Sequence, residues 1–289
     1  MKLTFWGVRG SIPTPEAYAI GIGGNTSCVS VLVDDHLVIF DAGTGLRNLG
    51  QYIEDKDRSQ WKGTIFISHY HWDHIQGLPF FEPAYREQNR FHIFGKTKHG
   101  NHIEDILAEQ MESPFFPVDM DSLEGLVTFQ PVEENRTIAV TPEVSVRTVG
   151  LNHPNGGIGY RLDHPMGSIS YFSDQEHPTD TVGTSIVDFV RNSTVLIHDA
   201  QYLPLEKKGS KSGWGHSSWE DAVLTAREAG VKQLFLFHHD PVRTETELIA
   251  MLDDARKTFK HTEIAREREV YTLANGCVSK AGQEELLRT

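Results

Sequence analysis

Cysteines and long apolar runs are both scarce in this sequence of 289 residues. Only Cys28 and Cys277 are present, too few for a disulfide framework, so a reducing cytoplasm is the expected location. No apolar run approaches the roughly 18 residues that span a bilayer. The first ten residues also lack the apolar segment of a secretory signal. Disulfide-rich scaffolds and membrane-spanning proteins are therefore excluded as classes.

Positive charge is also in short supply. The chain has 27 Lys and Arg against 40 Asp and Glu, a formal charge of −13. This balance argues against a protein that wraps a long nucleic acid, because such binding depends on neutralising phosphates. It leaves room for a small anionic substrate at a locally positive site. With no repeat or Pro-rich linker, we expect one domain over residues 1–289 with a frayed tail over 279–289.

Hydrophobic periodicity predicts a mixed fold of the α/β or α+β class. Strand patterns occupy Lys2–Trp6, Thr26–Val33, Leu37–Asp41, Gly63–Ser68, Phe91–Phe94, Val144–Val149, Gly157–Leu162, Ser168–Phe172, Thr194–His198, Lys232–Phe237 and Val270–Leu273. Helix patterns occupy Thr44–Glu54, Asn101–Met111, Val182–Arg191, Ser217–Ala229 and Thr244–Phe259. The helix from Ser217 opens on Ser-Ser-Trp-Glu, a capping-box pattern. This order indicates two sheets packed together with helices outside.

What the sequence has in excess is histidine, with 15 in all. The densest cluster is Ser68-His69-Tyr70-His71-Trp72-Asp73-His74, which follows a predicted buried strand, and a helix can begin over residues 75–78. A strand end places His69 and His71 on one side, because side chains alternate along a strand. The turn then returns Asp73 and His74 to the same place. Imidazole and carboxylate ligands at this density suit zinc, iron or manganese; the alternative is a polar loop that happens to be rich in histidine.

Three further candidate ligands each follow a separate apolar stretch. His153 follows Val144–Leu151, Asp174 follows the strand ending at Phe172, and His238 follows the strand ending at Phe237. A surface histidine is more often found among polar residues. Together with the first cluster, these three residues predict a site for two metal ions.

The pattern HxHxDH, followed by a lone His, a lone Asp and a lone His, resembles the metallo-β-lactamase superfamily. The resemblance runs from Lys2 to about Leu273 and implies a four-layer αββα sandwich. It implies two divalent metal ions (Zn, Mn or Fe), one held by His69, His71 and His153, the other by Asp73, His74 and His238, with Asp174 bridging them. Asp41, in Ile39–Gly43, matches the Asp that supports a metal ligand from behind; the alternative is a carboxylate at a turn or helix entry.

A further pair of residues resembles one branch of this superfamily in particular. His216, in Gly213–Ser218, lies 22 residues before His238, and Asp199 ends a predicted strand. The pair resembles the phosphodiesterase branch, which includes ribonuclease Z and the PhnP-like cyclic phosphodiesterases, where such a His, oriented by an acidic residue, contacts the scissile phosphate. With Asp73, they are the expected catalytic residues. Alternatively, His216 is a neighbour of a helix cap and Asp199 a solvated strand-end carboxylate.

Two other features concern the substrate. Ribonuclease Z normally carries a long basic arm that grips tRNA, whereas residues 101–126 here are acidic and apolar. The segments Phe5–Pro13 and Gly23–Cys28 resemble a bacterial subgroup described as cyclic-nucleotide phosphodiesterase-like. We therefore expect a small phosphodiester, a 3′,5′-cyclic nucleotide hydrolysed to the monophosphate, and neither long nucleic acid nor membrane as a partner.

Several alternatives remain open from the sequence. The same metal site serves lactonases and thioesterases, a tRNA 3′-processing endonuclease fits the branch, and a binding or regulatory protein would keep the site without turnover. Phe115 and Phe116 either stack on a base or belong to the core or a dimer contact. The role of His239, the metal identity and the oligomeric state are undecided, although similar proteins are commonly homodimers.

Overall fold

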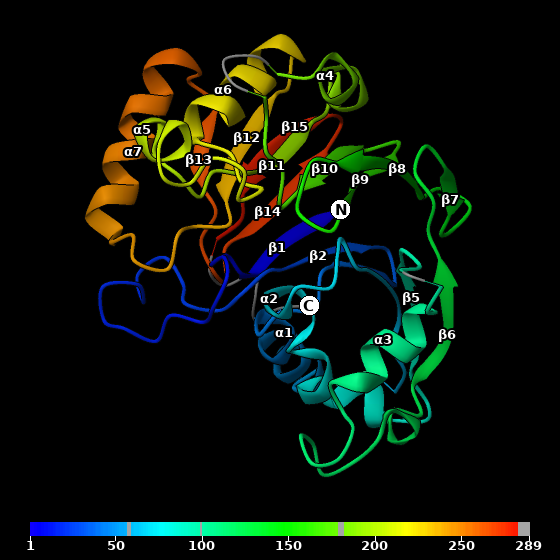
Figure 1. Cartoon of the computed structure of the whole chain (residues 1–289). Coiled ribbons are helices and arrows are strands. Elements are labelled where there is room, and N and C mark those ends of the chain that lie inside the picture. The colour runs from blue at the N-terminus through cyan, green and yellow to red at the C-terminus, as the bar shows by residue number, and fades with distance from the viewer. Residues whose placement is uncertain (57–58, 99, 179–181, 283–289) are drawn as a thin grey trace.

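Two β-sheets lie face to face at the centre of the computed structural model, which describes residues 1–56, 59–98, 100–178 and 182–282 (Figure 1). The first sheet has the spatial order β15 (Cys277–Lys280), β14 (Val270–Ala274), β1 (Lys2–Gly7), β2 (Cys28–Val33), β3 (His36–Phe40), β4 (Lys62–Phe66), β5 (Arg90–Gly95) and β6 (Leu126–Pro131). The second sheet has the order β13 (Thr262–Ile264), β12 (Gln233–Phe237), β11 (Val195–Asp199), β10 (Gly167–Phe172), β9 (Gly157–His164), β8 (Ser145–Leu151) and β7 (Thr137–Ala139).

Helices cover the outer faces of both sheets, which confirms the expected αββα sandwich (Figure 1). The α-helices are α1 (Gly45–Glu54), α2 (Trp72–Ile75), α3 (Ile103–Glu109), α4 (Thr184–Val190), α5 (Pro204–Lys208), α6 (Trp219–Glu228) and α7 (Glu245–Thr258), and single 3₁₀ turns occupy Leu78–Phe80, Glu82–Tyr85 and Met120–Ser122. Among the described residues, no helix has the length and apolar character needed to cross a membrane.

An aromatic core joins the two sheets. The ring of Phe40 on β3 stacks on Tyr171 of β10 and Tyr160 of β9, with centroids 5.2 and 5.9 Å apart. All three side chains are fully buried. The central strands β3 and β12 are nearly continuous apolar runs because one face of each packs in the core between the sheets and the other packs against helices.

Strand direction brings the candidate site residues to one edge. Strands β10, β11 and β12 are parallel, and β8 runs with them because both β8 and β10 are antiparallel to β9. In the first sheet, β3 and β4 are also parallel. The carboxyl ends of these strands therefore present the residues that follow them at a common edge of the sandwich.

The structure corrects several sequence predictions at the periphery. Strands β6, β7, β13 and β15 were not predicted, because each is short or half exposed and lacks a strong apolar pattern. The predicted frayed tail is wrong at Ser279 and Lys280, which pair with Thr272 and Tyr271 of β14; residues 283–289 of that tail lie outside the described part.

Two helix starts also differ from the prediction. The helix expected near residues 75–78 begins at Trp72 and ends at Ile75, because the Gly77 N–H bonds to the Ala42 carbonyl instead of continuing the helix. The capping box of α6 is shifted by one residue. It joins Ser218 to Asp221, while the Ser217 hydroxyl donates to the Gln175 carbonyl.

We predict that Phe40→Ala lowers the free energy of unfolding by about 3–5 kcal/mol, because it opens a cavity between the sheets. Phe115→Ala, at a ring that is 80% exposed, is the matched control and should change it by less than about 0.5 kcal/mol. Urea unfolding of the metal-free protein measures both. A similar loss in the two variants would contradict the placement of Phe40 in the inter-sheet core.

Candidate metal centre

Two groups of three side chains converge at this edge of the sandwich. In the first, Nδ1 of His71 lies 2.9 Å from Nε2 of His69 and 3.1 Å from Nε2 of His153. His69 and His71 lie in the loop after β4 rather than at its end, so the expected position is right but the strand-alternation reason is wrong. His153 follows β8. These three nitrogens form the first triad.

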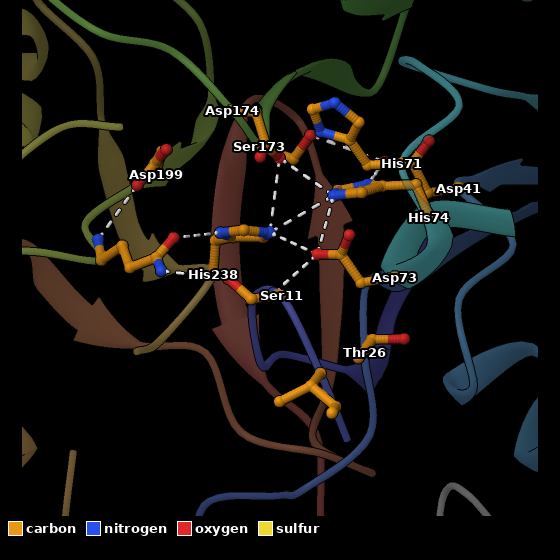
Figure 2. Close-up of polar contacts among 12 residues, drawn as sticks. Ser11, Thr26, Asp41, His71, Asp73, His74, Ser173, Asp174, Asp199 and His238 are labelled. Atoms are coloured by element: carbon orange, nitrogen blue, oxygen red, sulfur yellow. Dashed lines mark hydrogen bonds and ion pairs between the residues drawn. The ribbon is translucent and has the colours of Figure 1, made fainter. Parts of the chain in front are cut away.

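The second triad is nearly equilateral. The Nε2 atoms of His74 and His238 are 3.3 Å apart, and each lies 3.2 Å from Oδ2 of Asp73 (Figure 2). Asp73 and His74 come from α2, and His238 follows β12. The ligand atoms of a tetrahedral zinc ion are about 3.3 Å apart when its bonds are 2.0–2.1 Å, so the spacing suits one divalent ion.

Asp174 faces both triads with different oxygen atoms. Its Oδ1 lies 3.9 Å from His69 Nε2 and 3.7 Å from His153 Nε2. Its Oδ2 lies 3.1 Å from His74 Nε2 and 3.4 Å from His238 Nε2. A carboxylate in this position can be shared by two cations, as the sequence prediction of a bridging residue requires.

Hydrogen bonds behind the triads set the tautomers of four histidines. Nδ1 of His153 donates to the Gly215 carbonyl, Nδ1 of His74 to Asp41, and Nδ1 of His238 to the Gln201 side chain. The Ser68 hydroxyl donates to Asp41 and thus accepts from Nδ1 of His69. In the neutral ring, each Nε2 atom therefore turns a lone pair toward its triad.

The titration behaviour agrees with metal ligands. Burial lowers the pKa of His69, His71 and His153, so these rings are neutral and available as donors. Burial also disfavours the charged forms of Asp73 and Asp174, but His74 and His238 outweigh it and hold both pKa values well below the usual range. In turn, burial lowers the pKa of His74, but Asp73, Asp174 and Asp41 outweigh it and raise that pKa well above its ordinary value. Lone pairs and negative charge converge in one buried place, and this donor set of nitrogen and oxygen without sulfur fits zinc, manganese or iron.

Asp41 is fully buried behind the second triad. Its carboxylate accepts hydrogen bonds from His74 Nδ1 at 2.7 Å, from the Ser68 N–H and hydroxyl at 2.7 and 2.8 Å, and from the Tyr171 hydroxyl at 2.8 Å. The residue has a positive φ of 60°, which turns the chain sharply after β3. Its position is that of a support for His74, not a solvated turn carboxylate.

Glycine is required at two points where backbone meets a histidine ring. A Cβ on Gly215 would lie 2.2 Å from Nδ1 of His153, and the residue has a φ of +91°. A Cβ on Gly10 would lie 2.4 Å from Nδ1 of His238. Any larger residue at either point would displace a ring that contributes to a triad.

Sequence reasoning missed Gln201 as a supporting residue. Its Oε1 accepts from His238 Nδ1 at 3.0 Å, and its backbone N–H donates to Asp199 at 3.0 Å. Its Nε2 donates to the Ser11 hydroxyl, and the Ser11 N–H donates to Asp73 at 2.7 Å. The signal in the sequence was that Gln201 lies two residues after Asp199. Asp199 ends β11, which lies between two strands that are each followed by a proposed ligand.

Glu176 was also missed. Its carboxylate accepts from the N–H groups of Gly213 and Gly215, both at 2.8 Å. It therefore holds the loop that supplies the carbonyl partner of His153 and leads into His216. A polar residue two positions after Asp174 gave no distinctive pattern in the sequence.

His216 and Asp199 form a buried pair beside the triads. Nδ1 of His216 lies 2.8 Å from Asp199, whose carboxylate is fully buried, and the His216 ring stacks on His238 with centroids 5.1 Å apart. Burial lowers the pKa of His216, but Asp199, with Asp174 and Asp73, outweighs it and raises the pKa to about 9. The predicted pairing is thus present, and it leaves Nε2 free of this bond.

The triads open into a cavity of about 420 Å³, which reaches the exterior. Its lining includes His71, Asp73, Asp174, His216 and His238, together with Ser11, Tyr70 and Trp72. A small substrate in this cavity would contact both triads and His216.

The structure also places the residues whose roles the sequence left undecided. His239 points away from the triads, and its Nε2 donates to the Ala265 carbonyl at 3.1 Å. Burial, aided by Arg9, lowers its pKa to about 3, so it is a neutral structural residue. Phe116 packs partly against the core, whereas Phe115 is largely exposed.

Known proteins resemble this chain in sequence and in fold. Residues 36–239 match the family model of a beta-lactamase superfamily domain. Ribonuclease Z of Thermoplasma acidophilum is 27% identical over 316 aligned positions, covering 94% of this chain and 96% of that protein. The metallo-β-lactamase fold protein YhfI of Bacillus subtilis has a TM-score of 0.70 at 18% identity and covers 94% of this chain and 99% of that one. A diphosphatase of the PhnP family has a TM-score of 0.65 at 17% identity, covering 93% and 95% of the two chains.

We predict that the purified protein binds two equivalents of Zn²⁺ or Mn²⁺ and that His238→Ala retains one, because only the second triad loses a nitrogen. His261→Ala, at an exposed histidine, is the control and should retain two. Elemental analysis after dialysis measures the stoichiometry. Two equivalents in His238→Ala would contradict the assignment of His238.

We predict that Asp41→Asn weakens metal affinity by about 10- to 100-fold, because the residue that orients His74 loses its charge. Competition with a chelating dye measures the affinity, and circular dichroism verifies that the variant is folded. The control is Asp163→Asn, which removes a carboxylate that pairs with Arg147 and Arg161. Unchanged affinity in a folded Asp41→Asn protein would refute the supporting role.

Proposed function

This chain belongs to the β-lactamase superfamily, and on that premise we propose that it is a metal-dependent phosphodiesterase with a dinuclear centre. The proposed ligands are His69, His71 and His153 for one ion, Asp73, His74 and His238 for the other, and Asp174 for both. When bound, two divalent ions supply activation of water and stabilise negative charge on the phosphoryl oxygens. The fold alone does not select this reaction, because one fold hosts many chemistries.

The observation that carries the proposal is the His216–Asp199 pair beside the triads. Asp199 accepts from Nδ1 of His216, which directs the other ring nitrogen to the cavity. A protonated imidazole there can hold a phosphoryl oxygen and donate a proton to the leaving oxygen. Asp199 itself is held by the N–H groups of Gln201 and Gln175, so the pair is oriented before substrate binds.

A small diester is the proposed substrate class. The connection between β9 and β10 is a two-residue turn, and the segment from Asn101 to Leu126 contains α3 and a 3₁₀ turn, with Leu107 and Met120 buried. Neither forms an extended basic arm. The net charge of −13 also disfavours contact with many phosphates. Among small diesters, we propose a 3′,5′-cyclic nucleotide, hydrolysed to its monophosphate.

Cleavage of tRNA is the second candidate, and the comparisons favour it. The similar protein from Thermoplasma acidophilum is called ribonuclease Z and matches over nearly the whole chain. The expectation that no long nucleic acid binds is therefore unconfirmed. A cytoplasmic location also stays a prediction, in keeping with Cys28 and Cys277 as free thiols, and so does a homodimer.

The two candidates are separated by assaying the Mn²⁺- or Zn²⁺-loaded protein with cyclic AMP, cyclic GMP and a precursor tRNA. We expect metal-dependent conversion of a cyclic nucleotide to its monophosphate and no tRNA cleavage at equal enzyme concentration. Cleavage of the precursor with no turnover of either cyclic nucleotide would favour the second candidate. Turnover of a lactone or thioester, but of no diester, would refute both.

We predict that His216→Ala lowers kcat for cyclic AMP by about 10²- to 10⁴-fold through loss of the proton donor. The loss should be smaller for bis(p-nitrophenyl) phosphate, because its leaving group departs without a proton, and activity on a carbon ester should be spared. Metal content, measured in parallel, should stay at the wild-type level. Equal losses on both diesters would argue against proton donation by His216.

A further inference from the structure

A second cavity adjoins the one above the metal triads. It has a volume of about 600 Å³, and its walls include the rings of Tyr70, Trp72, Phe80, Phe115 and Phe116; we call it the aromatic groove. Tyr70 and Trp72 also line the cavity of about 420 Å³ at the triads, which we call the metal cavity. The two cavities therefore lie next to each other and share these two side chains, which flank His71 in the sequence.

Three of the five rings that line the aromatic groove are more than half exposed. Trp72 is 81% exposed, Phe115 80% and Phe80 53%. Exposed aromatic side chains gathered around one cavity mark a binding site rather than scattered surface residues. The five rings come from three separate stretches of chain, at residues 70–72, 80 and 115–116, so the groove is assembled by the fold.

Contacts beneath the aromatic groove hold some of its rings in place. The Tyr70 hydroxyl donates to the Lys96 carbonyl at 2.6 Å. The hydroxyl is therefore engaged with backbone, and the ring serves as a wall. Phe80 and Phe116 meet edge to face with centroids 5.5 Å apart, and Phe116 packs against the core beneath the first sheet. These contacts hold three of the five rings, those of Tyr70, Phe80 and Phe116, in place before any ligand arrives.

The aromatic groove has few polar lining residues, namely Gln76, Glu109 and Gln110. Glu109 is the one charged residue among those that line it. Gln110 also lines it, and its Nε2 atom is buried with no hydrogen-bond partner among the described residues. The other lining residues apart from Gln76 are apolar or aromatic, so the aromatic groove suits an uncharged, planar group.

We propose that the aromatic groove binds the nucleobase of a substrate whose phosphate occupies the metal cavity. This inference rests on the proposed function and assigns a base subsite to it. A phosphodiester group carries charge and suits the triads, whereas a planar base has an apolar face that stacks on aromatic rings. One nucleotide thus satisfies two adjoining cavities of opposite character.

The test compares two cyclic diesters, cyclic AMP with a base and glycerol 1,2-cyclic phosphate without one. For Phe115→Ala and Phe80→Ala, we expect KM for cyclic AMP to rise about 10-fold at similar kcat, because stacking contributes to binding but not to bond cleavage. Neither variant should change the kinetics with glycerol 1,2-cyclic phosphate. Ile249→Ala, at a partly exposed position on α7, is the matched control and should alter neither substrate.

A binding measurement keeps this test independent of turnover. In saturation-transfer NMR with AMP, the base protons should receive more saturation from the wild-type protein than the ribose protons, and Phe115→Ala should reduce that difference. This result is expected even if cyclic AMP is not hydrolysed, so failure of the proposed function is distinguishable from failure of the subsite.

Two outcomes would overturn the base subsite. One is an equal loss of activity on both diesters, with sedimentation showing that Phe115→Ala converts a dimer to a monomer; the aromatic groove would then be a contact between copies of the chain. The other is unchanged KM for cyclic AMP and unchanged base saturation in both phenylalanine variants.

Discussion

The buried carboxylate of Asp41 is the constraint on which the rest of the structure depends. A fully buried charge is costly unless hydrogen bonds compensate it, and here donors come from both sheets and from α2. Tyr171 belongs to β10 of the second sheet, Ser68 follows β4 of the first, and His74 belongs to the second triad. The same atoms that satisfy Asp41 therefore fix the sheets relative to each other and aim one ligand.

The site follows from this arrangement because its residues come from both halves of the sandwich. His69, His71, Asp73 and His74 follow β4, whereas His153, Asp174 and His238 follow strands of the second sheet. Neither sheet alone holds a complete triad with its bridge. The supporting contacts of Gln201 and of the Gly215 carbonyl also cross between loops that are distant in sequence. The site therefore forms only when the two sheets pack together.

The proposed metal ligands could be predicted from the sequence because each of them has a recognisable local pattern. His153, Asp174 and His238 each follow an apolar strand, and His69 to His74 form a dense cluster. Gln201 and Glu176 leave no such signature, since their roles depend on ring and backbone partners 37 to 39 positions away. Strands β6 and β7 escaped prediction because edge strands need not be apolar. The exposure of Phe115 and the partial burial of Phe116 could not be predicted either, because neighbours in sequence with the same side chain differ only in tertiary contacts.

In the proposed mechanism, both triads bind metal ions that act together with His216 on one phosphate. Crystallography of the Mn²⁺-loaded protein with a non-hydrolysable cyclic AMP analogue, with anomalous scattering to locate the metal ions, tests it most directly. We predict two anomalous peaks about 3.5–4 Å apart, one at each triad with Asp174 between them, and a phosphoryl oxygen within hydrogen-bond distance of His216. A single peak, or a phosphate that contacts neither triad, would contradict it.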